Sequence, residues 1–402
     1  MEARVLHRYK LTKKQKNESA FLIGARYYRG QTANLQGLAT DGDRADFKFN
    51  NPSALENSDY RFPSQNFAAF TDNIWFLGDR WTVNAGLRFE YIQSSAIGYY
   101  NQYNIHPLTF DTLSSYKIES SNTVTRSLPL VGAGASFKTG KFSNAYLNFC
   151  QNYRAVNFSD IRVANPNILV DSTIKDEYGN TTELGWRGFI GKYFYTDLAT
   201  FVLFYGDKIG LAPQPNSTKK IRTNIGNALN TGLECFVEFD FIKAFVDSAK
   251  IGSSIFVNFS YIHATYISSR EKSYVGKQVE YVSPIMLKSG LKIRAKNWQV
   301  QVQGSYNSAQ FSDATNSKTG SGDAVIGEIP AYFVMDLSAR YTFKKYFQLE
   351  AGVNNLLNSS YYTRRATAYP GPGILPSDGI TIYGTLQFTI DVKRSEERRV
   401  GK

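Results

Sequence analysis

Cysteine, methionine and histidine are scarce in this chain, which holds two, three and three of them among 402 residues. Cys150 and Cys235 lie far apart and fall on opposite faces of their segments, so we expect no disulfide between them. His7, His106 and His263 are too few and too dispersed to form a metal cluster. Neither a nucleophile-elbow motif nor a phosphate-binding loop is present. We therefore expect no enzyme, no cofactor and no resident metal.

Long apolar runs are absent as well. No run of about eighteen or more apolar residues occurs, which excludes a helical membrane span. The first residues, MEARVLH, lack the basic region, apolar core and small-residue cleavage site of a secretory signal. We expect either that export is encoded elsewhere or that the chain is a fragment of a longer protein.

Aromatic residues, by contrast, are abundant, with 27 Tyr and 28 Phe. This composition is typical of β-strands and of the aromatic girdles at membrane interfaces. The formal net charge is +12, but Lys and Arg are dispersed among expected turns and loops. Nucleic-acid binding usually requires a basic stripe, so no nucleic-acid partner is expected.

The dominant pattern is an alternation of apolar and polar residues at period two, which recurs from end to end. In residues 81–91 every odd position is apolar or aromatic, and residues 297–306 and 379–390 alternate in the same way. These segments reach about ten residues, the length that a tilted strand needs to cross a bilayer. The polar rows, including Arg88 and Glu90, must then face a hydrated lumen, because a cation facing lipid costs about 2–4 kcal/mol.

Connections between these segments alternate between short and long. Short turns are expected near residues 14, 78–80, 139–141, 191–192, 247–248, 295–296 and 344–345, and long loops near 29–64, 94–124, 154–178, 206–227, 266–279, 309–329 and 357–378. Since the strands are antiparallel, all short turns share one rim and all long loops the other. This arrangement is typical of outer-membrane barrels.

We therefore predict an all-β fold, a transmembrane antiparallel up-and-down β-barrel with about fifteen strands present. Bacterial barrels have even strand numbers, so we expect the barrel to be incomplete N-terminally and not to close by itself. Residues 1–392 are assigned to the barrel. The charge-dense, aperiodic residues 393–402 are predicted to be a non-native or disordered tail.

Several segments carry a family resemblance. Residues 351–361, AGVNNLLNSSY, resemble the G-x-x-N-L-x-N-x-x-Y segment before the final strand of TonB-dependent receptors. Residues 152–160, 183–186, 204–209 and 224–234 are similar to further family segments and follow in the family's order. The motif positions are Gly352, Asn354, Asn355, Asn358, Tyr361, Asn224, Gly226, Gly232 and Glu234. Because Asn and Gly tolerate unusual backbone angles, we expect structural roles for these positions rather than ligand contact.

The resemblance implies an active transporter in the outer membrane of a Gram-negative bacterium, taking up a large, scarce nutrient. The complete family fold has an N-terminal plug inside a barrel of about twenty-two strands. TonB would act through that plug, and neither the plug nor a TonB-binding segment is found in this sequence.

Cationic and aromatic residues of the expected loops are the candidates for ligand binding. They are Arg154, Arg162, Lys219, Lys220, Arg222, Tyr361, Tyr362, Arg364 and Arg365. Guanidinium groups bind carboxylates in a bidentate manner, which favours an anionic ferric chelate such as ferric citrate or a siderophore complex. The simpler interpretation is that these side chains solvate the loops or bind lipopolysaccharide phosphates. Uptake of a glycan or of cobalamin, and a passive porin or surface-binding barrel, are the alternative functions.

Overall fold

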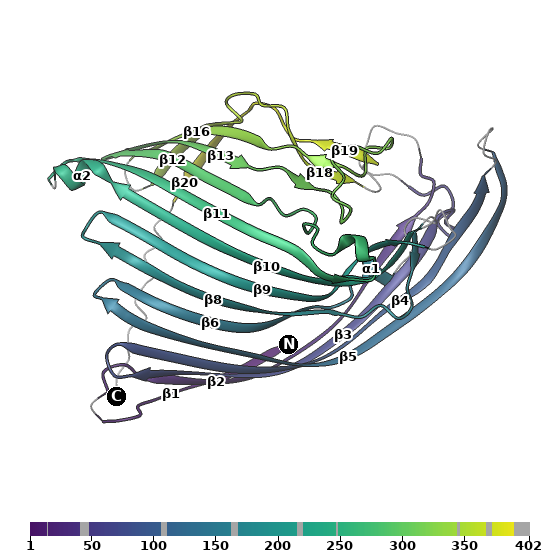
Figure 1. The fold of residues 1–402 in the computed structure, drawn as a ribbon, viewed down its shortest axis with the longest axis horizontal. Helices are drawn as coiled ribbons and strands as arrows, with labels where there is room; N and C mark the ends of the chain where they lie inside the picture. The colour runs from purple at the N-terminus through teal and green to yellow at the C-terminus, as the bar shows by residue number, and fades with distance from the viewer. Residues whose placement is uncertain are drawn as a thin grey trace, which may run out of the picture. The chain divides into compact units, whose positions relative to one another are not determined.

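The alternating segments form long antiparallel strands that pair with their neighbours in chain order (Figure 1). The computed structural model describes residues 1–13, 15–40, 48–105, 111–161, 168–214, 220–246, 248–343, 346–366 and 372–389. The main sheet follows a path of strands that begins at β1 (Glu2–Tyr9) and ends at β20 (Thr381–Phe388). Its other strands are β2 (Ser19–Gln36), β3 (Ser58–Leu77), β4 (Trp81–Ile105), β5 (Thr112–Gly140), β6 (Ser143–Arg154), β8 (Glu177–Ile190), β9 (Phe194–Pro213), β10 (Lys220–Asp240), β11 (Ile251–Ser269), β12 (Ile285–Ala295), β13 (Trp298–Asn307), β16 (Tyr332–Phe343) and β17 (Phe347–Asn354).

The remaining elements are short and lie in the connections. They are α1 (Phe158–Ile161), β7 (Ile168–Val170), α2 (Phe241–Phe245), the 3-10 turn η1 (Lys272–Tyr274), and the hairpins β14 (Gln310–Phe311) with β15 (Glu328–Ile329) and β18 (Tyr362–Ala366) with β19 (Gly373–Pro376). β7 pairs in parallel with β10 and becomes the sixteenth strand of the main sheet. The all-β antiparallel prediction is confirmed, including the count of about fifteen strands along the path. Among the described residues, no helix is long and apolar enough to cross a membrane.

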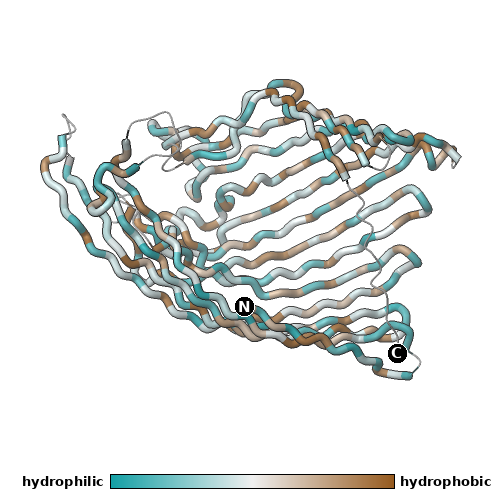
Figure 2. The backbone as a smooth tube through the Cα atoms, turned by 180° about the vertical axis from the view of Figure 1, so that it is seen from behind, coloured by the Kyte–Doolittle hydropathy of each residue, from teal (hydrophilic) through white to brown (hydrophobic). Residues whose placement is uncertain are grey.

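In the long strands apolar side chains are exposed and polar side chains are covered, which is the reverse of the burial pattern in a soluble sheet. On β4, Leu87 and Phe89 are 49% and 43% exposed. Glu90, which lies on the polar face of the same strand, is only 7% exposed. Figure 2 shows the same alternation of hydrophobic and hydrophilic residues along the tube. An exposed apolar row is stable only where lipid covers it, so this pattern supports the predicted membrane barrel.

Two of the expected loops are wrong in extent. Residues 94–124 belong mostly to β4 and β5, whose pairing continues from Trp81 and Phe137 as far as Ile105 and Thr112. Residues 206–227 belong mostly to β9 and β10. In the outer ends of β4 and β5 polar residues, such as Asn101 and Gln102, occupy both faces, so the alternation disappears there although the backbone ladder continues.

The expected turn at residues 247–248 is also longer than predicted. It begins with α2, whose first turn is capped by Asp240, because the Asp240 carboxylate accepts a hydrogen bond from the Lys243 backbone N–H at 3.2 Å. Short and long connections otherwise alternate as the sequence predicts.

The chain divides into two compact units, which are considered separately below. Unit 1 comprises Met1–Leu184, Phe201–Thr231 and Ala264–Lys277, and unit 2 comprises Gly185–Thr200, Gly232–His263 and Gln278–Lys402. Cys150 belongs to unit 1 and Cys235 to unit 2, and both are free thiols.

Candidate functional site

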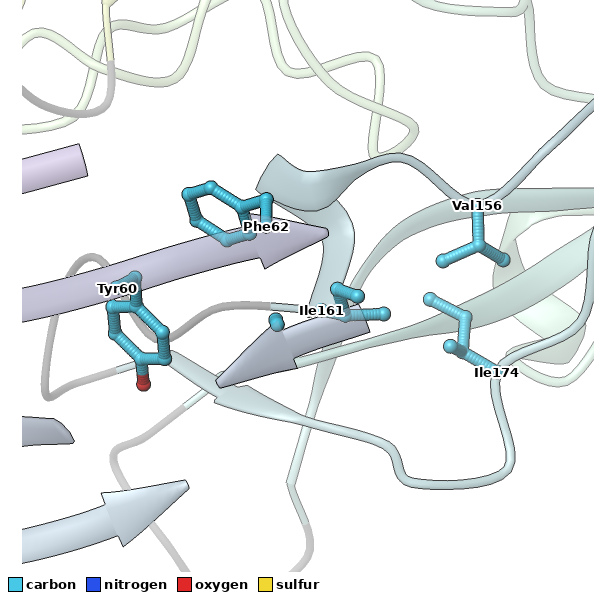
Figure 3. Packing of buried hydrophobic residues seen from close by; sticks show 6 residues of the cluster. Tyr60, Phe62, Val156, Ile161 and Ile174 are labelled. Carbon is cyan, nitrogen blue, oxygen red and sulfur yellow. The ribbon is translucent and has the colours of Figure 1, made fainter. Parts of the chain in front are cut away.

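In unit 1 the connection between β6 and β8 folds back onto the polar face of β3 and β4. Val156, Ile161 and Ile174 from this connection form a buried apolar cluster with Tyr60 and Phe62 of β3 (Figure 3). All five side chains are at most 7% exposed. Packing on this scale fixes the position of a connection that would otherwise be a free loop.

A buried ion pair lies beside this cluster. Arg126 Nε is 2.6 Å from Asp176 Oδ2, and the two side chains are 6% and 15% exposed. Asp176 Oδ1 also accepts a hydrogen bond from the Val156 backbone N–H at 2.7 Å. The Arg126–Asp176 contact is close but lacks hydrogen-bond geometry, and Arg126 Nη2 has no hydrogen-bond partner among the described residues. The pair therefore fixes the connection through charge, while two buried donor nitrogens of Arg126, Nε and Nη2, form no hydrogen bond with the described residues.

Arg154, a predicted ligand-binding residue, is held by two carboxylates. Its Nη2 donates to Asp160 Oδ2 at 2.9 Å, and its Nη1 lies 3.4 Å from Glu177 Oε1. Glu177 in turn accepts hydrogen bonds from the Tyr205 hydroxyl at 2.5 Å and the Ile209 backbone N–H at 2.6 Å. The Arg154 side chain is 37% exposed, so an external anion has access to it. That anion would have to compete with the Asp160 and Glu177 carboxylates for the guanidinium group.

Arg222 contacts α1, the same short helix that Arg154 contacts. Its Nη1 donates to the backbone carbonyl of Ser159, next to the Asp160 that pairs with Arg154. The neighbouring Thr223 hydroxyl donates to Asp171 Oδ2 at 2.6 Å. α1 is thus fastened to strands on both sides of the connection.

Asp171 is the anchor of the parallel β7–β10 pairing. Hydrogen bonds from Thr173 and Thr223 lower the pKa of the Asp171 carboxyl, and the Arg270 guanidinium 3.7 Å away adds to this effect. The carboxylate therefore stays ionised at neutral pH. Of the other predicted residues, Arg162 and Lys219 lie outside the described residues, and only the backbone of Lys220 is described, paired with Ile168.

In unit 2 the predicted residue Arg365 is buried rather than presented to a ligand. It is 7% exposed, and its Nη1 and Nη2 donate to the carbonyls of Ala324 and Glu328 at 2.7 and 2.9 Å. Nη2 also donates to the Tyr362 hydroxyl at 3.0 Å, and the Tyr281 hydroxyl donates to the Arg365 carbonyl at 2.9 Å. Arg365 therefore fastens three long connections to one another.

The adjacent residues Arg364 and Tyr361 are differently placed. Arg364 is exposed, and the ring of Tyr361 stacks on Tyr332 with centroids 4.7 Å apart. Burial raises the pKa of the nearby Tyr281 hydroxyl, although the charges of Arg364 and Arg365 oppose this, so the phenol is neutral and can donate. The hairpin thus presents an exposed guanidinium group, and the stacked aromatic pair begins at Tyr361, directly before the hairpin strand.

The motif residues of the last long connection are engaged in backbone geometry. Asn355 and Asn358 adopt positive φ of 50° and 49°. The Asn355 side chain bonds to Ser359 and to the Asp378 carbonyl, while Asn358 Oδ1 accepts the Ile380 N–H at 3.0 Å. Asn tolerates this left-handed conformation better than most residues.

Most of the other motif positions also contact neighbouring strands or connections, and Glu234 is the exception. Asn354 pairs with Thr381 across β17 and β20, and a Cβ on Gly352 would lie 2.5 Å from the ring of Tyr383. The Asn224 side chain bridges Lys175 and the Asp207 carbonyl. A Cβ on Gly226 would lie 2.1 Å from the Ser268 carbonyl oxygen, so this close approach requires glycine. The Gly232 carbonyl accepts a hydrogen bond from Thr200 at 3.1 Å, and Glu234 is exposed.

Three residues important to these sites were not found by sequence reasoning. Arg126 directly precedes the run SLPLV, residues 127–131, where apolar residues on both faces conceal the alternation. Tyr281 and Arg270 lie in a loop and become significant only through partners distant in sequence. Within the described part of the chain, no group of three or more His, Cys, Asp or Glu side chains could hold a metal ion.

Comparison with known proteins bears directly on this architecture. The family model described as "TonB dependent receptor-like, beta-barrel" matches residues 6–356. The chain belongs to the TonB-dependent receptor family. Its members are receptors and transporters rather than enzymes, and their barrels are outer-membrane structures.

Solved receptor structures share the fold at low sequence identity. The unliganded ferric citrate transporter FecA gives a TM-score of 0.73 at 20% identity, with 96% of this chain and 53% of that chain covered. The ferric yersiniabactin receptor FyuA from Yersinia pestis gives 0.67 at 17% identity, covering 97% and 54%. The copper transporter OprC gives 0.64 at 15% identity, covering 96% and 61%. The chain therefore spans between half and two thirds of the length of these proteins.

Proposed function

We propose that this receptor chain takes part in the active uptake of an anionic ferric chelate across the outer membrane. The observation that supports this proposal most is the exposed Arg364 on a hairpin that the buried Arg365 holds in place. A guanidinium group on a fixed support can bind a carboxylate with little further loss of side-chain freedom. The proteins of similar fold include transporters of ferric citrate and ferric yersiniabactin.

The physical steps of capture follow from charge and geometry. The net charge of +12 attracts an anionic chelate and raises its rate of encounter. Arg364 then binds a carboxylate of the chelate, while the stacked Tyr361 and Tyr332 supply an apolar surface for its organic part. Arg154 in unit 1 is a separate candidate anion contact, which an anion would reach by displacing Asp160 or Glu177.

The partners and location are part of the same proposal. Residues 1–392 would form the barrel portion of a receptor in the Gram-negative outer membrane. Residues 393–402, the expected tail, lie outside the described residues. TonB would supply energy through a plug domain, as the family resemblance implies. Lipopolysaccharide would surround the outer rim.

A glycan is the second candidate ligand. The stacked rings of Tyr332 and Tyr361 could bind a sugar face without any need for charge. Substitution separates the two ligands, because a neutral glycan would depend on Tyr361 and an anionic chelate on Arg364.

Titration of ferric citrate and a panel of ferric siderophores against intrinsic fluorescence tests the proposal. We expect saturable quenching by one chelate and an affinity about tenfold or more weaker in Arg364→Ala, because a charge-assisted hydrogen bond is lost. Arg80→Ala, on a short connection, is the matched control for the loss of one charge and should bind normally. The absence of a response to every chelate would contradict the iron proposal, and a response to glycans that depends on Tyr361 would favour the second candidate.

A further inference from the structure

A basic pocket lies in unit 2 at the strand ends that are joined by short connections. The Arg364 hairpin belongs to a long connection, which joins the other ends of the strands. The basic pocket has a volume of about 410 Å³. Five cationic side chains line it, which are Lys243, Lys250, Arg294, Lys296 and Arg340. No other pocket described in the structure gathers so many charges of one sign.

Strand register places the two arginines of the pocket in one lateral row. Arg294 of β12 is opposite Gln299 of β13, which is opposite Arg340 of β16. Neighbouring strands lie about 4.8 Å apart, so the arginine backbones are separated by about 10 Å with the Gln299 amide between them. The row belongs to the polar face, because Trp298 and Val300, which alternate with Gln299, are exposed on the apolar face.

The row continues to Gly252 of β11, which is opposite Arg294. A Cβ at Gly252 would lie 3.2 Å from the Asp240 carboxylate and 3.6 Å from the Lys243 side chain. α2 therefore folds over this end of the row and brings Lys243 to it. The Asp240 carboxylate that could neutralise Lys243 instead accepts the backbone N–H groups of Lys243 and Ser253.

Carboxylates of the protein neutralise only part of this charge. Arg340 donates twice to Glu350 Oε2, at 3.0 and 2.8 Å, whereas Arg294 approaches Glu238 only to 3.9 Å and is 52% exposed. Within the described part of the chain, Lys243, Lys250 and Lys296 form no ion pair. Three lysines and one loosely paired arginine are thus available to an external anion.

We propose that this pocket is a second anion site, which binds a compact oxyanion carrying two or more negative groups, either carboxylates or phosphates. Two arginines whose backbones are about 10 Å apart, with the Gln299 amide between them, suit a ligand with two or more anionic groups. The lining side chains Arg294, Gln299 and Arg340 belong to the polar row, and Trp298 of the apolar face borders the pocket. The proposal is independent of the ferric-chelate proposal, because it rests on different residues at the other ends of the strands.

Calorimetric titration of the receptor, expressed from its own gene and folded in detergent, with iron-free citrate and with inorganic pyrophosphate, tests the site. We expect saturable binding of one or both anions, weakened about tenfold or more by Arg294→Gln. Lys141→Gln is the matched control, since it removes one exposed positive charge from a short connection of unit 1, and its affinity should be unchanged. Equal weakening by both substitutions would show general charge attraction and overturn the proposal.

A gain of affinity provides a test that misfolding cannot imitate. Glu350→Gln removes the carboxylate that competes for Arg340, so binding should become several-fold tighter. Loss of binding in Glu350→Gln would contradict the site. Binding of an acidic peptide or of short-chain phosphatidylglycerol, without binding of citrate or pyrophosphate, would assign the pocket to a protein or lipid contact and also overturn the proposal. Failure of these titrations would leave the ferric-chelate titrations at Arg364 unaffected.

Discussion

Arg364 and Arg365 are adjacent in the chain and equal in charge, yet the structure uses them in opposite ways. Arg365 directs its donors at the carbonyls of Ala324 and Glu328, while Arg364 faces solvent. Sequence reasoning could place both in a cationic loop but could not tell them apart. The difference arises from a connection some forty residues earlier in the chain, so only the folded structure reveals it.

The two arginines should therefore respond differently to substitution. Arg365→Ala removes several charge-assisted hydrogen bonds and leaves the Ala324 carbonyl without this donor, while the Glu328 carbonyl keeps the hydrogen bond from the Tyr362 hydroxyl. The expected cost is about 2–3 kcal/mol in local stability. Limited proteolysis of the folded protein should then cut the connections 308–331 and 355–380 faster. Arg364→Ala is the control and should be cut at the native rate. Equal rates for native protein and Arg365→Ala would contradict the assigned clamp.

Asp171 gives a prediction for pH. Its pKa in the folded protein lies below its ordinary value of 3.8, so ionised Asp171 stabilises the fold fully above that value. The stabilisation is lost as the pH falls through the lowered pKa of the folded state. Hydrogen exchange of residues 168–176 should be slow from pH 7 to 5 and accelerate, after correction for intrinsic rates, below about pH 4. Asp171→Asn should remove this acid transition, and an unchanged transition in that variant would assign it to another group.

At the scale of elements, the account depends on which face of each strand meets lipid. Leu291, near the middle of β12, is 38% exposed on the apolar face, whereas Gln303 of β13 donates to Asp336 on the polar face. Leu291→Arg should cost about 2–4 kcal/mol in unfolding free energy. Gln303→Arg should cost less than about 1 kcal/mol, because the new cation faces Asp336. Urea unfolding from lipid vesicles measures both, and equal costs would contradict the assignment of the faces.

Strands with one apolar and one polar face were the part of the fold that the sequence predicted best. Residues 297–306 were expected as a strand, and β13 covers Trp298–Asn307. The ends of β4, β5, β9 and β10 were mistaken for loops, because outside a membrane nothing requires one face to be apolar. β7 and the two small hairpins were also missed, since each is fixed by pairing with another segment of the chain rather than by its own pattern. α2 was missed as well, although its Asp240 cap is local.

At the scale of the molecule, the family was recognisable because its motifs record backbone requirements. Asn355, Asn358 and Gly226 occupy positions where the chain turns or approaches a neighbour closely, and such positions restrict residue type strongly. Ligand-binding residues carry no comparable signature, because an exposed Arg in a loop is compatible with many backbone conformations. The fold could therefore be read from sequence, while the binding residues could be proposed only as a set of cations and aromatics.

Uptake of radiolabelled iron by cells that express the receptor from its own gene tests the central claim most directly. Each ferric chelate that quenches fluorescence should be supplied to a strain with TonB and to an otherwise identical strain without it. We expect iron to accumulate only where receptor and TonB are both present, and accumulation to fall about tenfold or more in Arg364→Ala at limiting chelate. Uptake that persists without TonB, or no iron uptake from any chelate, would contradict the proposed function.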